Sequence, residues 1–369
     1  MFALGIALAV PASAMPVFAQ RYHFRCGVCH TAMPELNAFG NYFRDHGYRL
    51  PPPAKRHPTT VVAVRYNVEW EQDPAPGSRR FSPSASILGD QDVGPINAYI
   101  HYGLGNGGAP ASTYLGFLSY YNQPTASLYR LGLYELPLPQ SPGQRLDSIS
   151  TYGYYGTSVG LNDLDLNAPR LGLESERTIG DAKLALSVAF GEFKGAAYGG
   201  APVFTGAETV AARPEVELYA HSPLFGNLFD INALALDGIR SIHEPGRADF
   251  LDPYERVGFG IHTSFFQKRL DLEAEQFLGR DNDADGAGDA INSSGGWTRL
   301  KYFVTPHFYA AARLDTAANP FPTRTLVLYT GAMIFNHARI VFEHRNNLHS
   351  GPGSLGGYLI IAGPWTPGL

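Results

Sequence analysis

Most of the chain alternates between apolar and polar residues. From Val62 to Glu71, valines and aromatic residues occupy the even positions, and small, polar or charged residues occupy the odd ones. This period of two is the pattern of a β-strand with one apolar face. About sixteen segments with this pattern occur, a number typical of large membrane barrels. They begin near Thr60, Pro95, Ser112, Ser127, Ser148, Pro169, Ala182, Arg213, Asp230, Arg256, Leu270, Gly296, Phe308, Arg324, His337 and Leu355.

The lengths of the connections give a second indication of a barrel. In outer-membrane barrels, extracellular loops are long and follow odd strands, whereas periplasmic turns are short and follow even strands. Long connections lie near 72–94, 195–212, 241–255 and 279–295, all after odd strands in this count, and 136–147 is the one exception. We therefore expect an all-β, transmembrane antiparallel β-barrel over residues 59–369. It would lie among outer-membrane lipid of a Gram-negative bacterium, with a periplasmic N-terminus.

Composition and the first residues agree with an exported β-protein. Charged residues make up 17% of the chain, against roughly 25% in typical soluble proteins. The net charge of -5 comes without a basic stripe, which argues against a nucleic-acid partner. Residues 1–14 combine an apolar run with an Ala-Ser-Ala ending, which predicts a signal peptide.

The two cysteines of the chain lie in one motif, Cys26-Gly27-Val28-Cys29-His30. This C-x-x-C-H pattern predicts covalent attachment of one haem c, with both thiols bound to the porphyrin and His30 as an axial ligand of the iron. A zinc site would need further ligands at matching spacing, and a thioredoxin-like pair would need a βαβ context. A disulfide is the remaining alternative. We assign the haem segment to residues 15–58.

A short helix is expected after the motif. Leu36, Phe39, Gly40 and Phe43 share one helical face, with Thr31 or Pro34 at its start. We rank His46, near the end of this helix, first as the second axial ligand. The alternative is that His46 interacts only with the C-terminal end of the helix. The other nearby candidates are Met33, His23 and His57.

The haem segment is too short to bury a porphyrin, because chains below roughly 40 residues rarely form a core of their own. A barrel of this size encloses a lumen that can receive a small plug. We therefore expect the haem segment inside the barrel or at its periplasmic mouth. Charged residues of both signs should line the lumen, namely Arg65, Glu69, Glu215, Glu217, Asp271, Glu273, Glu275, Arg299, Lys301, Arg313, Arg339 and Arg345.

The first mature residues resemble a known family. Pro16-Val17-Phe18-Ala19, Tyr22, the C-x-x-C-H motif, Pro34, Leu36-Asn37, Gly40, Phe43 and Gly47-Tyr48 are similar to the outer-membrane monohaem cytochrome–porin fusions, which include iron-oxidising outer-membrane cytochromes. The resemblance implies an oxidoreductase-like electron transfer through one haem. Extracellular Fe(II) would be the donor, and a periplasmic cytochrome or copper protein would receive the electrons. Cys26, Cys29 and His30 carry over directly, whereas the second axial ligand does not.

One further motif lies in a predicted extracellular loop. Asp281, Asp283 and Asp285 have the spacing of the first half of a calcium loop, although Asn292 replaces the usual final Glu. A solvated acidic loop is the alternative. For the whole chain, two other functions remain open. One is a porin whose haem segment is a structural or regulatory plug, and the other is a periplasmic cytochrome fused to a β-domain.

Overall fold

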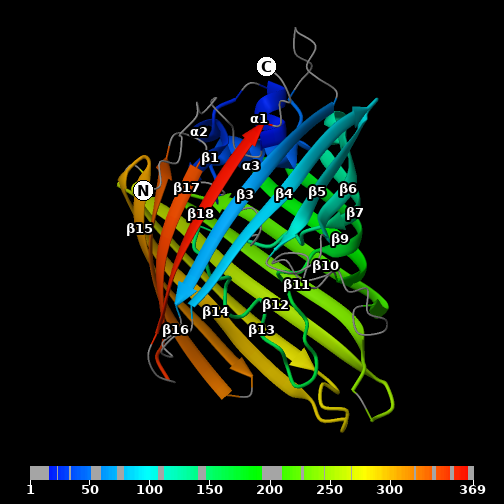
Figure 1. Ribbon diagram of the computed structural model, residues 1–369. Helices are drawn as coiled ribbons and strands as arrows, with labels where there is room; N and C mark the ends of the chain where they lie inside the picture. The colour runs from blue at the N-terminus through cyan, green and yellow to red at the C-terminus, as the bar shows by residue number, and fades with distance from the viewer. Residues whose placement is uncertain are drawn as a thin grey trace.

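A closed antiparallel barrel forms most of the molecule (Figure 1). The computed structural model describes residues 16–22, 24–32, 35–50, 60–72, 79–106, 112–139, 147–192, 210–225, 228–244, 246–266, 268–319, 321–334, 338–349 and 353–364. The sixteen barrel strands are β3 (Thr60–Gln72), β4 (Arg79–Val93), β5 (Ile96–Asn106), β6 (Ser112–Asn122), β7 (Ser127–Tyr134), β8 (Arg170–Ile179), β9 (Ala182–Glu192), β10 (Val210–Leu224), β11 (Phe229–Ile242), β12 (Phe250–Phe265), β13 (Leu270–Asp281), β14 (Ile291–Thr305), β15 (Phe308–Asn319), β16 (Phe321–Ile334), β17 (Ala338–Asn347) and β18 (Ser354–Pro364). The last strand pairs with the first, with Tyr358 opposite Glu69. The expected fold class is therefore confirmed.

Alternation along each strand separates an apolar outside from a polar inside. On β13, Leu272 and Leu278 are exposed on the outer surface, whereas Asp271, Glu273 and Glu275 are buried inside. Closure pairs the strand edges, and an apolar outer face suits contact with lipid, so this barrel meets the requirements for spanning a membrane. Among the described residues, no helix has the length and hydropathy needed to cross a membrane.

One expected strand does not form and one strand was missed, so the two errors cancel in the count. The stretch 72–94, expected to be a loop, contains β4, which pairs with β3 and β5. Pro83 and Gly89 interrupt the alternation in β4, so this strand was not predicted from the sequence. The expected strand near Ser148 does not form. With β4 included, the connection after β7 follows the fifth barrel strand, so the supposed exception at 136–147 obeys the loop rule.

The connection after β7 folds back into the barrel. Its described residues are 135–139 and 147–169. Residues 147–169, here called the inward loop, contain no strand, although Ser148, Ser150 and Tyr152 alternate with apolar residues or threonine. Its backbone bonds to wall side chains, because the N–H groups of Ile149 and Ser150 donate to Glu343 over 2.7 and 3.1 Å. Tyr152 lies against Trp297, with ring centroids 4.0 Å apart. The alternation therefore serves packing against the wall rather than strand pairing.

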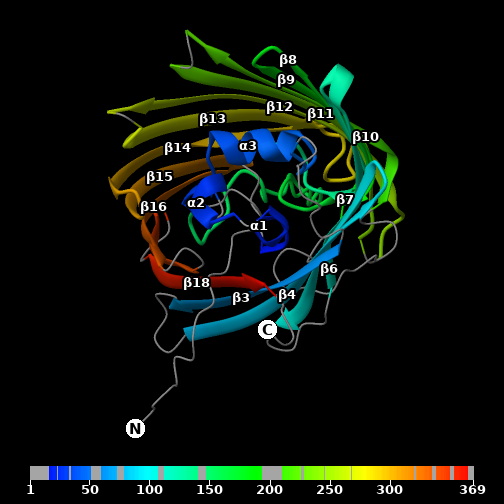
Figure 2. The ribbon, with the colours of Figure 1, turned by 90° about the horizontal axis from the view of Figure 1, so that it is seen from above.

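The N-terminal segment lies within the ring of strands (Figure 2). It consists of α1 (Pro16–Tyr22), α2 (Cys26–Cys29), the short pair β1 (His30–Ala32) and β2 (Glu35–Leu36), and α3 (Ala38–Asp45). We call its described residues 16–22, 24–32 and 35–50 the plug. Arg49 donates to the carbonyl of Pro95 over 2.9 Å, in the tight turn between β4 and β5. The plug thus occupies the end of the barrel that carries the short turns. Residues 1–14, including the predicted signal peptide, lie outside the described residues.

Candidate functional site

The C-x-x-C-H motif forms one compact turn of the plug. Cys26 to Cys29 make up α2, and His30 opens β1 and pairs with Leu36 of β2. Cys29 is not in a disulfide, and burial raises the pKa of its thiol to about 11. Burial therefore favours the neutral thiol of Cys29 over the thiolate. The side chain of Cys26 lies outside the described atoms.

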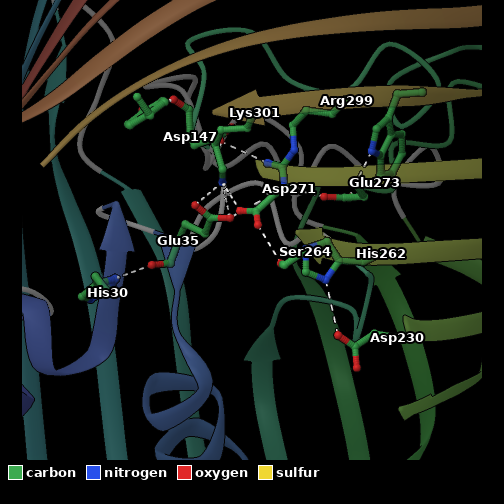
Figure 3. Close-up of polar contacts among 12 residues, drawn as sticks. His30, Glu35, Asp147, Asp230, His262, Ser264, Asp271, Glu273, Arg299 and Lys301 are labelled. Atoms are coloured by element: carbon green, nitrogen blue, oxygen red, sulfur yellow. Dashed lines mark hydrogen bonds and ion pairs between the residues drawn. The ribbon is translucent and has the colours of Figure 1, made fainter. Parts of the chain in front are cut away.

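His30 has the environment of a metal-ligating histidine. Its ring is buried, and Nδ1 lies 3.2 Å from the backbone oxygen of Glu35 (Figure 3). A carbonyl can only accept, so Nδ1 must carry the proton, and in the neutral ring Nε2 then carries the lone pair. Metal-bound histidines commonly donate their second nitrogen to a backbone carbonyl in this manner. The geometry of His30 therefore suits an axial ligand of a haem iron.

Helix α3 packs closely on the motif. It begins after Asn37 rather than at the expected Thr31 or Pro34, because the Asn37 side chain caps it by accepting from the N–H of Gly40 over 2.9 Å. A Cβ on Gly40 would lie 2.1 Å from the carbonyl oxygen of Cys29. Glycine at this position is thus explained by the contact between α2 and α3.

The aromatic face of α3 forms the core of the plug. Phe39 packs edge-on against Phe24, and Phe43 packs edge-on against Tyr22 and Phe18, with ring centroids 5.4 to 5.8 Å apart. Phe18 also stacks on Tyr48 at 4.3 Å. The plug therefore carries a small core of its own, and the barrel wall covers the rest of it.

His46 lies at the opposite end of α3 from His30. Its Nδ1 is 2.7 Å from the carbonyl oxygen of Tyr42, and its ring packs against Tyr42 and against Tyr121 of β6. The eight residues of α3 span roughly 12 Å at about 1.5 Å per residue. The structure thus places His46 as a helix C-cap and does not bring it to His30. The second axial ligand stays a prediction, and Met33, His23 and His57 lie outside the described residues.

Three groups of ion pairs hold the plug to the wall. Arg21 is buried and binds Asp90 and Asp92 of β4 at 2.5 and 2.9 Å. Asp45 pairs with Lys183 of β9 at 3.1 Å. Glu35 forms the third anchor with Lys301 of β14. Because each anchor contacts a different part of the wall, the plug is held in one orientation.

The third anchor connects the plug, the wall and the inward loop (Figure 3). Both carboxylate oxygens of Glu35 accept from the Lys301 ammonium, which also lies 3.2 Å from Asp147 of the inward loop. Arg299 pairs with Asp147 at 3.1 Å. Burial raises the pKa of Asp147, but Arg299 and Lys301 more than offset this, so its pKa lies below the usual range. For Glu35, burial outweighs the same two cations, and its pKa is raised.

A cavity of about 580 Å³ lies between the plug and the wall. This volume is within the range of roughly 300–1,000 Å³ typical of cofactor and small-molecule sites. Thr31, which follows His30, lines it, as do α3 and wall residues that include Tyr134, His262 and Glu275. The cavity thus offers space beside the motif, with one wall from the plug and the other from the barrel.

The lumen-facing charges expected from the sequence lie inside the barrel. Glu215, Glu217, Asp271, Glu273, Glu275, Arg299, Lys301, Arg313 and Arg339 are buried, and Arg65, Glu69 and Arg345 are half-buried. The anchor residues Arg21, Glu35 and Asp147 were not identified from the sequence. A charged residue within an apolar segment, as Arg21 is in α1, was the signal available for the first of them.

The three aspartates of the acidic loop have separate partners. Asp281 pairs with Arg256 at 2.8 Å, whereas Asp283 and Asp285 accept backbone N–H groups of Gly288 and Ala287. Within the described part of the chain, no group of three or more His, Cys, Asp or Glu side chains is arranged to hold a metal ion. Calcium at Asp281, Asp283 and Asp285 therefore stays a prediction.

Comparison with known proteins places the fold. No family model and no curated protein matches the chain. An anion-selective porin from Comamonas acidovorans is similar over 83% of this chain and 100% of its own, with a TM-score of 0.58 and 11% identity. The outer-membrane channel DcaP of Acinetobacter baumannii covers 82% of this chain and 96% of its own, with a TM-score of 0.54 and 8% identity. Salmonella typhi OmpF covers 82% and 97%, with a TM-score of 0.57 and 8% identity. The chain therefore has the sixteen-stranded fold of outer-membrane porins.

Proposed function

We propose that this protein is an outer-membrane electron-transfer protein, with one haem c attached at Cys26 and Cys29 of the plug and ligated by His30. The observation that carries the proposal is the bond from Nδ1 of His30 to the Glu35 carbonyl, directly after a C-x-x-C turn. This bond presents Nε2 as the ligand atom.

The position of the plug supports transfer across the membrane. The plug lies at the short-turn end of the barrel, which is the periplasmic end in bacterial outer-membrane barrels. The N-terminus is then periplasmic, as export of the chain requires.

When bound, the haem supplies reversible one-electron chemistry at its iron. The residues of the chain would do the rest. Cys26 and Cys29 would hold the ring, and His30 would bind the iron. The aromatic core around Phe39 and Phe43 excludes water from one side of the plug. Extracellular Fe(II) as donor, and a periplasmic cytochrome or copper protein as acceptor, are proposals that rest on the resemblance of the first residues.

A second candidate function is a porin whose plug has a structural or regulatory role. The observation in its favour is the fold, because the similar solved structures are described as porins and channels. The 580 Å³ cavity beside the plug also leaves space in the lumen. Against free diffusion, the plug and the inward loop both occupy the lumen and meet at Lys301.

One experiment separates the two functions. The detergent-purified protein is reconstituted in liposomes, and its visible spectrum is recorded anaerobically before and after Fe(II) is added outside. The electron-transfer function predicts reduced-haem bands, with slow solute efflux. Haem that is reduced by dithionite but not by external Fe(II) would argue against iron as the donor. A protein that carries no haem and releases solutes rapidly would support the porin function instead.

A further inference from the structure

We infer that Lys301 of the barrel wall is a positioning residue for His30, because it holds the β1–β2 pair through Glu35 and so sets the direction of Nε2. This inference rests on the proposed function, since Nε2 is assigned to the haem iron. It identifies a residue 271 positions away from His30 as part of the haem environment.

A single residue of the plug, Glu35, connects Lys301 to His30. Glu35 uses its backbone oxygen to accept from His30 and its carboxylate to accept from Lys301. Its backbone is also paired with Ala32, so the residue is fixed on both sides. A displaced Glu35 side chain would rotate or shift the carbonyl that orients the His30 ring.

Lys301 is itself held rigidly. Its side chain is completely buried, and its ammonium lies 3.2 Å from Asp147, 3.8 Å from Asp271 and 5.1 Å from the centre of the Phe303 ring. Arg299 adds a second contact to Glu35 at 3.7 Å. A lysine with these neighbours has little rotamer freedom, so it can fix the position of Glu35. The inward loop, through Asp147, thereby also supports the hairpin.

The bond from a ligating histidine to a carbonyl makes the imidazole a stronger donor to the metal. A stronger donor stabilises the ferric more than the ferrous iron. Loss of the Lys301 anchor should therefore raise the midpoint potential of the haem and add a high-spin fraction to its spectrum. A residue that only keeps the plug in place would not change either property selectively.

The control variant is Lys183→Met, which removes the anchor at Asp45 and leaves the hairpin contacts intact. Lys301→Met and Glu35→Gln should both raise the midpoint potential, measured by spectroelectrochemistry on the full chain. Lys301→Arg should restore most of the wild-type value, and Lys183→Met should leave it unchanged. Equal shifts in Lys301→Met and Lys183→Met would overturn the inference, because the effect would then reflect plug seating in general.

A second readout does not depend on haem. In the full chain with Cys26→Ser and Cys29→Ser, hydrogen exchange should accelerate in the peptide 30–36 when Lys301 is replaced by Met, but not when Lys183 is. Unchanged exchange in that peptide would overturn the anchoring step. A wild-type protein without haem would refute the proposed function, whereas a haem-loaded Lys301→Met protein with an unshifted potential would refute only this inference.

Discussion

Replacement of Arg21 by Met should let the plug leave the lumen more often. Arg21 is 1% exposed, and its guanidinium binds Asp90, whose side chain is fully buried, and Asp92, whose side chain is 30% exposed. Removal of one partner of a buried ion pair costs about 3–5 kcal/mol, because the other charge remains buried. Because Arg49 still binds Asp92 at 2.7 Å and the amide of Asn97 lies 2.5 Å from Asp90, we expect the lower end of this cost, about 3 kcal/mol.

A change of about 3 kcal/mol raises the undocked population roughly 100-fold, at about 1.4 kcal/mol per factor of ten. The plug should still be docked most of the time. Val17, Phe18 and Phe43 remain buried, and each contributes about 1.5–3 kcal/mol. The expected phenotype is therefore an increase in brief channel openings rather than a permanently open pore.

Single-channel recording in planar lipid bilayers measures this directly as open probability. Arg25→Met is the matched control, because Arg25 lies in the same segment and is exposed. The double variant Arg21→Met with Asp90→Asn should approach the wild type, since it leaves no unpaired charge on Asp90. An open probability in Arg21→Met equal to that of Arg25→Met would refute the view that this buried pair holds the plug.

Three further predictions concern the plug and one loop. Gly40→Ala should destabilise the plug by about 1–3 kcal/mol through its contact with Cys29, and limited proteolysis should then cut the plug faster than in wild type. The pKa of Asp45 is lowered, since Lys183 and Arg44 outweigh the effect of burial. The stabilisation that Asp45 gives to the docked plug is therefore fully present above about pH 3.9, the pKa of this group in the unfolded chain. It is lost as the pH falls further. The open probability should rise less steeply with falling pH in Asp45→Asn than in wild type, and an equally steep rise would contradict this. If calcium binds the loop, calorimetry should detect it in wild type and not in Asp283→Asn.

The sequence by itself determined the class of fold and most of its elements. Between Val62 and Glu71 the alternation is uninterrupted, and β3 forms there; β13 alternates from Leu270 to Glu275, and β17 alternates except at Val341 and His344. The two-residue period of a half-buried strand involves only adjacent residues, so it can be recognised in the sequence without knowing the partner strand. The lumen-facing carboxylates of β13 follow from the same period. The prediction of haem c at the C-x-x-C-H motif is likewise local, since it depends on five adjacent residues.

Tertiary structure decided what depends on distant contacts. Strand β4 forms despite Pro83 and Gly89 because β3 and β5 flank it on both sides. Residues 148–152 alternate but form no strand, because the backbone there bonds to wall side chains such as Glu343. Lys301 meets both Glu35 and Asp147 only because the closed barrel brings β14, the plug and the inward loop to one place. The residue pattern of a single strand cannot predict these contacts, because they form only inside the lumen of the closed barrel.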